Sequence, residues 1–166
     1  MSTGSTISAR LSFNMIDPET IGVLKQAKSF VLGELPQVLD RFYDHIAKFP
    51  ETAAFFKNRE HMMHAKKMQL QHWSIIMEGS FNETYEASVT KIGEVHNRLG
   101  LEPRWYIGGY NALITGLVEA ISCRMPSRRF DSSAAARKAK LQTAIIKVAM
   151  LDMDLAIAVY INAGRR

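Results

Sequence analysis

The chain has very little of two features that mark secreted and membrane proteins: cysteine and long apolar runs. Its 166 residues contain a single cysteine, Cys123, so no internal disulfide can form. No uninterrupted apolar run approaches the ~18 residues of a membrane helix, and residues 1–10 are too polar for a secretory signal peptide. We therefore expect a soluble, cytoplasmic protein without a membrane partner, in which Cys123 is a small buried hydrophobe.

Acidic residues are also fewer than basic ones, 16 against 21, which gives a formal net charge of +5. A nucleic-acid surface would gather the excess on one face, but here the basic residues fall into short separate clusters. A solvated surface is the better interpretation, and we expect no nucleic-acid partner. Apolar residues make up 47% of the chain and charged ones 22%, which is enough for one packed domain.

The motifs of common enzyme classes are missing as well. The chain has no Gly-rich phosphate loop, nucleophile elbow or CxxC, and no paired Glu-x-x-His motifs of a di-iron bundle. Asp152 and Asp154 stand two apart on an expected helix and so lie on different faces. His61 and His64 have a metal-ligand spacing but lack a third ligand, so we expect them to be exposed. No intrinsic enzymatic activity is predicted.

What the chain does have is helical periodicity in every well-patterned segment, with no convincing run of alternating β-branched residues. The pattern predicts an all-α fold. Prolines, glycines and capping residues divide the expected helices. They run from Pro18 to Gly33, from Pro36 to Pro50, from about Arg59 to Met77, from Asn82 to Leu99, from Pro103 to Pro126, and from Asp131 to Ile161.

One histidine in this pattern stands out. His96 lies in the last turn of an apolar stripe that includes Val89 and Ile92. A neutral imidazole in an apolar cleft is what a haem iron needs as its proximal ligand. A core histidine bonded to a carbonyl group would give the same pattern, so the spacing by itself leaves both interpretations open.

The residues after His96 are more specific. The segment His96–Tyr106 reads HNRLGLEPRWY and resembles the proximal signature of globin-coupled sensors, a histidine followed by Gly-Leu-x-Pro-x-Trp-Tyr. The segment Arg41–Tyr43, which reads RFY, is similar to the family segment that ends in the distal tyrosine. The resemblance covers roughly Ile21 to Ile161.

The resemblance implies a globin fold, a helical sandwich around haem b with a long C-terminal helix. We expect the sensor domain at residues 17–166, and the residues before Asp17 are interpreted as an N-terminal arm, residues 1–16, that orders only on a partner. The resemblance also implies that His96 ligates the iron, that the Tyr43 hydroxyl contacts bound oxygen, and that Tyr106 contacts the proximal side, where its hydroxyl is a candidate to bond the backbone near His96. Further residues expected at the haem are Phe42, Ala65, Met68 and Ile92, although ordinary core packing explains Ala65 and Met68 equally well.

These points favour a haem-based O₂ sensor that also binds CO and NO. The last helix is apolar over more than one face, which favours a homodimer through the last two long helices, and an output signalling domain is expected after it. The alternatives are a stand-alone globin for O₂ storage or NO detoxification and a cofactor-free helical interaction module. Within the haem hypothesis, His64 or His72 is a candidate sixth ligand.

Overall fold

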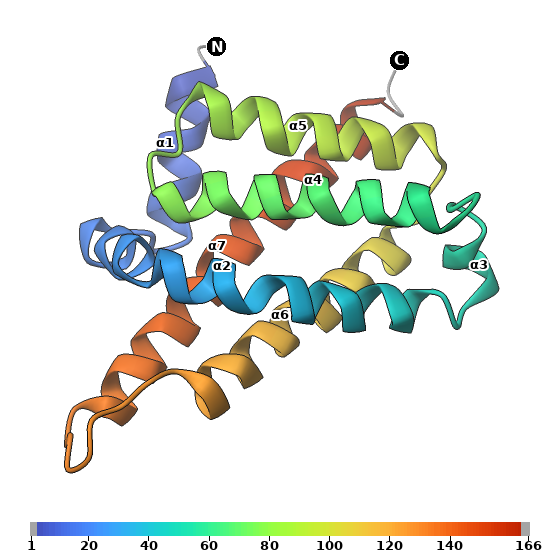
Figure 1. The fold of residues 1–166 in the computed structure, drawn as a ribbon. Helices are drawn as coiled ribbons and strands as arrows, with labels where there is room; N and C mark the ends of the chain where they lie inside the picture. The colour runs from blue at the N-terminus through green and yellow to red at the C-terminus, as the bar shows by residue number, and fades with distance from the viewer. Residues whose placement is uncertain (1–2, 164–166) are drawn as a thin grey trace.

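The computed structural model describes residues 3–163, with side chains from Ile7 onward, and all regular structure in that range is helical. The predicted all-α class is therefore confirmed. The helices, shown in Figure 1, are α1 Thr3–Phe13, α2 Pro18–Ile46, α3 Pro50–Ala53, α4 Arg59–Glu78, α5 Glu83–Arg98, α6 Pro103–Arg124 and α7 Ala134–Ala163.

Local capping sets several of these ends, as the sequence predicted. Asp17 accepts a 2.8 Å hydrogen bond from the backbone N–H of Thr20 and so begins α2. Asn82 begins α5 in the same way. After α5, Gly100 adopts a φ of +73°, a left-handed conformation that glycine reaches without strain.

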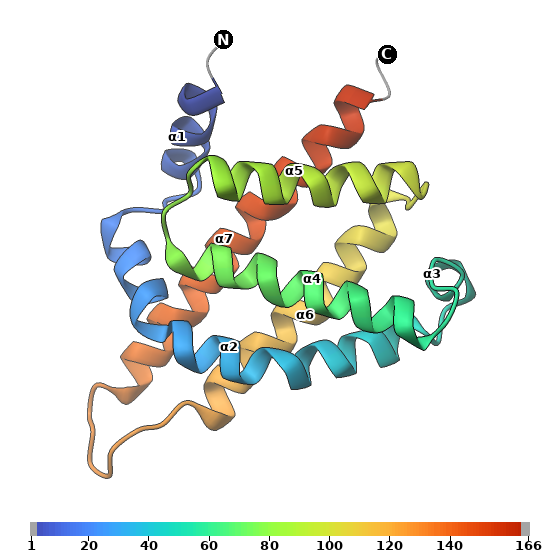
Figure 2. The same cartoon turned by 45° about the horizontal axis from the view of Figure 1, so that its top comes forward.

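The predicted break between Gly33 and Pro36 is wrong, because α2 continues through both residues. Proline removes one backbone hydrogen bond and usually kinks a helix, and Figure 2 shows α2 changing direction along its course. Leu35 and Leu39, on either side of Pro36, are fully buried. Burial of these side chains offsets the lost hydrogen bond, a tertiary effect that a local pattern does not reveal.

The N-terminal arm also differs from the expectation, because most of it forms α1. Ile7 on this helix and Ile16 just after it are buried in the core. Arg10 forms an ion pair with Asp154 on α7. These contacts dock α1 on the rest of the chain.

Cys123 is exposed, which corrects the expectation of a buried side chain. The buried residues at this end of α6 are Leu117, Ala120 and Ile121, spaced three and four apart. Position 123 falls outside that stripe and faces solvent.

The helices form two layers. Figures 1 and 2 show α2, α4 and α5 side by side, with α6 and α7 crossing behind them. The layers come into close contact at Gly116 and Gly93. A Cβ atom at Gly116 would lie 2.9 Å from Cγ1 of Val38 on α2, so this crossing needs a residue without a side chain.

None of the helices in the described range has both the length and the apolar character needed to cross a membrane.

Candidate cofactor site

A cavity of about 440 Å³ lies among α2, α4, α5, α6 and the corner around α3. Its volume falls in the range of small-molecule and cofactor sites. All seven residues predicted to contact a haem line it, namely Phe42, Tyr43, Ala65, Met68, Ile92, His96 and Tyr106. The structure thus brings the predicted residues together, while their contact with a haem stays a prediction.

Helix α2 contributes an aromatic wall to the cavity. The ring of Tyr43 meets Phe42 edge-on at a centroid distance of 5.0 Å and Phe56, after α3, at 5.8 Å. Tyr43 is only 6% exposed. Burial raises the pKa of its hydroxyl well above the usual value, so Tyr43 remains a hydrogen-bond donor at neutral pH.

Helix α5 brings His96 to the cavity from its last turn. Burial lowers the pKa of His96 to about 4, so its imidazole is neutral at pH 7. Its Nδ1 atom is buried without a hydrogen-bond partner in the described part of the chain. A neutral imidazole with a buried, unpaired nitrogen fits the donor that a metal centre requires.

Tyr106, at the start of α6, lies beside His96 with their ring centroids 5.2 Å apart. Its hydroxyl group is buried and has no hydrogen-bond partner among the described residues. The expected bond from Tyr106 to the backbone near His96 is therefore not present. Instead, the ring packs between His96 and Tyr160 of α7, whose centroid is 6.4 Å away.

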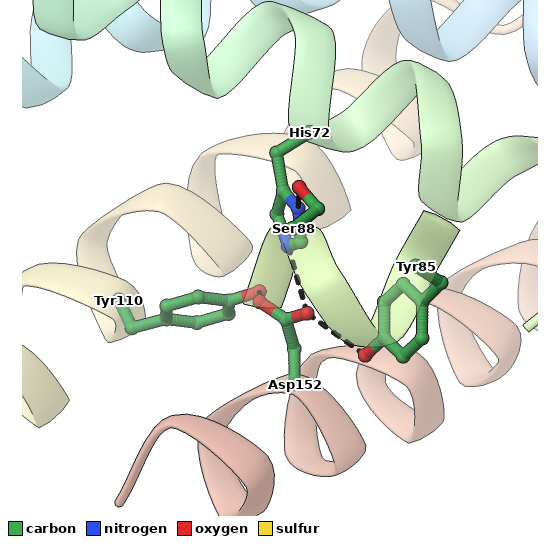
Figure 3. Close-up of polar contacts among 5 residues, drawn as sticks. All are labelled: His72, Tyr85, Ser88, Tyr110 and Asp152. Carbon is green, nitrogen blue, oxygen red and sulfur yellow. Dashed lines mark hydrogen bonds and ion pairs between the residues drawn. The ribbon is translucent and has the colours of Figure 1, made fainter. Parts of the chain in front are cut away.

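His72, a candidate sixth ligand, is buried rather than free. Its ring nitrogens face Ser88 Oγ at 2.7 Å and Asp152 Oδ1 at 2.8 Å. Asp152 also accepts hydrogen bonds of 2.9 Å from the hydroxyl groups of Tyr85 and Tyr110. Figure 3 shows these five residues converging from α4, α5, α6 and α7.

The rim of the cavity carries basic groups. His61 and His64 of α4 and Lys91 of α5 line it and are exposed, as predicted for the two histidines. Such groups at a cavity mouth suit the acidic part of an otherwise apolar ligand.

Sequence reasoning missed the network around Asp152, which it treated only as one of two acids on different faces. That placement is correct, because Asp152 is 1% exposed and Asp154 is exposed. The available signal was a carboxylate within the apolar stripe of α7, between Val148 and Ala156. A buried carboxylate requires donors, and the sequence could not say which.

The donor set fits a porphyrin better than a bare metal ion. Within residues 3–163, no three His, Cys, Asp or Glu side chains are grouped so that they could hold a metal. A haem supplies four equatorial nitrogens of its own and needs one axial ligand and an apolar slot. His96 and the cavity walls match those two requirements.

Comparison with known proteins agrees with this geometry. The protoglobin family model matches residues 3–166. The heme-based aerotactic transducer HemAT of Halobacterium salinarum is 28% identical over 160 residues, which are 95% of this chain and 33% of that protein. The chain thus spans a third of the length of this relative.

Two solved structures share the fold. The globin domain of the Geobacter sulfurreducens globin-coupled sensor matches with a TM-score of 0.79 and 20% identity, over 92% of this chain and 96% of that one. The globin domain of E. coli DosC, in a ferric form, matches with a TM-score of 0.72 and 17% identity, over 86% and 90%. The predicted globin fold and the resemblance to globin-coupled sensors are confirmed.

Proposed function

The chain belongs to the protoglobin family, and from this premise we propose that it is a haem-binding globin domain that senses a diatomic gas, with O₂ as the main ligand and CO and NO as others. The observation that carries the proposal is one cavity with the neutral His96 on α5 and the hydroxyl of Tyr43 on α2. The chain's part is to bind the gas and relay the event, without a reaction of its own.

When bound, haem b supplies an iron with a coordination position for the gas. His96 would ligate the iron, and the apolar walls of the cavity would keep water away from it. Tyr43 would donate a hydrogen bond to a bound gas, which favours polar O₂ over CO in a dry pocket. Phe42, Ala65, Met68 and Ile92 would pack around the porphyrin, and Tyr106, which lies against His96, would fix the orientation of its ring.

The basic rim gives the cofactor its orientation in this proposal. Lys91, His61 and His64 are exposed where the cavity opens. The two propionates are the acidic groups of a haem, and Lys91, His61 and His64 are the residues that would hold them.

A relay to an output domain requires that α7 responds to gas binding near His96. Helix α5 packs directly on α7 at Gly93, three residues before His96. The HemAT relative is about three times as long as this chain, which leaves room there for a further domain. We therefore propose that α7 leads to an output module in the full protein.

The proposed homodimer uses α6 and α7. The apolar residues that suggested a surplus face on this helix are Ala144, Ile145, Val148, Ala149, Leu151, Leu155, Ala156, Ala158 and Val159, and six of these nine are buried in this chain's own core. What supports the proposal is another apolar stripe on α7, with spacings of four and three: Ile146, Met150 and Ile161 are exposed, and Met153 and Ile157 are half-buried. Ile107 on α6 is exposed as well. A second copy would cover these side chains as an isologous bundle.

Haem titration tests the proposal. The purified chain is expected to bind one equivalent of haem and to show an intense Soret band that shifts on addition of O₂ or CO to the reduced protein. Failure to bind stoichiometric haem would favour the cofactor-free interaction module. Binding of gas without any effect on the full-length protein's output would favour a globin for storage or detoxification.

A further inference from the structure

His72 lines the cavity, yet neither of its ring nitrogens is free. Nε2 faces Asp152 Oδ1 at 2.8 Å and Nδ1 faces Ser88 Oγ at 2.7 Å. His72 is 2% exposed and Asp152 is 1% exposed, so water does not compete for these bonds. Figure 3 shows His72 on α4 turned toward Asp152 on α7.

The bonds at Asp152 fix which nitrogen of His72 carries the hydrogen. Tyr85 donates to Oδ1 of Asp152 and Tyr110 donates to Oδ2, each at 2.9 Å. Both carboxylate oxygens therefore act as acceptors, and Nε2 of His72 must be the donor to Oδ1. A metal binds only a ring nitrogen with a free lone pair. The Nε2 atom of His72 cannot bind iron while Asp152 holds it.

We propose that Asp152 is a positioning residue that keeps His72 from ligating the iron of a bound haem, so that a coordination position would stay open for a gas. The inference rests on the proposed haem function and assigns to α7 a direct part in the chemistry of the cavity. No other bond in the network holds Nε2, because Ser88 contacts only Nδ1.

Ser88 determines the state of His72 once the carboxylate is removed. Without Asp152, the satisfied tautomer of His72 carries its hydrogen on Nδ1 and donates it to Ser88 Oγ. Nε2 then has a free lone pair, on a side chain that lines the cavity and that only the bond to Ser88 still holds. In a metal-ligating histidine, one ring nitrogen usually donates a hydrogen bond to an acceptor, and the other has a free lone pair for the metal.

The test compares the reduced, gas-free haem protein with three variants by absorption and resonance Raman spectroscopy. Wild type is expected to be five-coordinate and high-spin, and Asp152→Leu six-coordinate and low-spin. The double variant with His72→Leu should return to five coordination, which assigns the new ligand. Asp154→Leu, on the same helix but exposed, serves as the control and should leave the spectrum unchanged.

Asp152→Asn is the conservative variant, which keeps a hydrogen-bond acceptor at position 152. Its Oδ1 can still accept from His72 and Tyr85, while its Nδ2 donates to the oxygen of Tyr110, so only one bond reverses. This variant should stay five-coordinate. An Asp152→Leu protein that binds haem and stays five-coordinate would overturn the inference.

A second readout needs neither haem nor a variant at position 152. In the haem-free wild type, the ¹⁵N chemical shifts of the His72 ring are expected to show hydrogen on Nε2, with His72→Leu identifying the signals. A bare Nε2 would overturn the inference even where Asp152→Leu does not fold. Haem content, measured first, separates this result from failure of the proposed function, since a wild type without haem contradicts the function itself.

Discussion

A Cβ atom on Gly93 would lie 3.0 Å from the backbone carbonyl oxygen of Ala156, so α5 reaches α7 only because position 93 has no side chain. The same Cβ would also lie 3.0 Å from Cβ of Val159. Because one of these contacts is with a backbone atom, a side chain at position 93 would require the two helices to move apart, and a change of side-chain rotamer would not relieve the contact. His96 lies three residues further along α5, so this crossing also supports the proposed iron ligand.

Gly93→Ala is therefore expected to destabilise the fold by about 1 to 3 kcal/mol, as overpacking does. Gly108→Ala on α6 is the matched control, since its Cβ would meet nothing within 4 Å. It should be neutral or stabilising by up to about 1 kcal/mol, because alanine favours helix. Urea unfolding measures both, and equal effects of the two substitutions would contradict the tight crossing.

His96→Ala is expected to abolish axial ligation and most haem retention, because a haem without covalent attachment depends on this one bond to the protein. The measurement is haem content after gel filtration together with the Soret band. His45→Ala is the control, since His45 is exposed on α2 and does not line the cavity. An unchanged Soret band with full haem content in His96→Ala would refute the assignment.

Tyr43→Phe is expected to speed O₂ dissociation while CO binding changes little. Only the polar ligand loses a hydrogen bond of about 1 to 3 kcal/mol, which corresponds to a rate increase of roughly 5- to 150-fold. Since burial raises the pKa of Tyr43, the wild-type rate should be constant from neutral to mildly alkaline pH. Stopped-flow rates measure this, with Tyr160→Phe outside the cavity as the control. Equal effects on both gases would show that Tyr43 only packs.

The stability of the haem-free protein is expected to fall in acid because of His96. Its pKa is lowered to about 4 in the fold from an ordinary value of 6.5. Between these two pH values the unfolded chain binds a proton that the folded chain does not, so the free energy of unfolding decreases by up to roughly 3 kcal/mol as the pH falls from 6.5 to 4. Urea unfolding across this range should show a shallower decrease for His96→Gln, and identical slopes would contradict the prediction.

The dimer should depend on the exposed stripe of α7. Light scattering at micromolar concentration is expected to give twice the chain mass of 18.7 kDa, and Ile146→Glu with Met150→Glu should return the monomer, since buried charges oppose association. Phe130→Glu, an exposed apolar side chain in the loop before α7, is the control and should stay dimeric. A wild-type mass of 18.7 kDa at every concentration would reject the interface.

The sequence by itself determined the features that depend on interactions between residues close together in the chain. Helical periodicity, the caps at Asp17 and Asn82, and the left-handed Gly100 each depend on residues within a few positions, so they were predictable. The candidate proximal and distal residues also came from short segments, His96–Tyr106 and Arg41–Tyr43, and the fold places them on one cavity.

Only the tertiary structure decided the features that depend on which helices pack against each other. Helix α2 continues through Pro36 because leucines on either side of it are buried by other elements, and residues 3–13 are helical and dock on the core through Ile7 and the Arg10 ion pair. His72 and Asp152 are eighty residues apart, so no local pattern could pair them. Their contact exists because the fold brings these side chains of α4 and α7 together in the core. A buried carboxylate needs hydrogen-bond donors, and the packing of the helices determines which residues supply them.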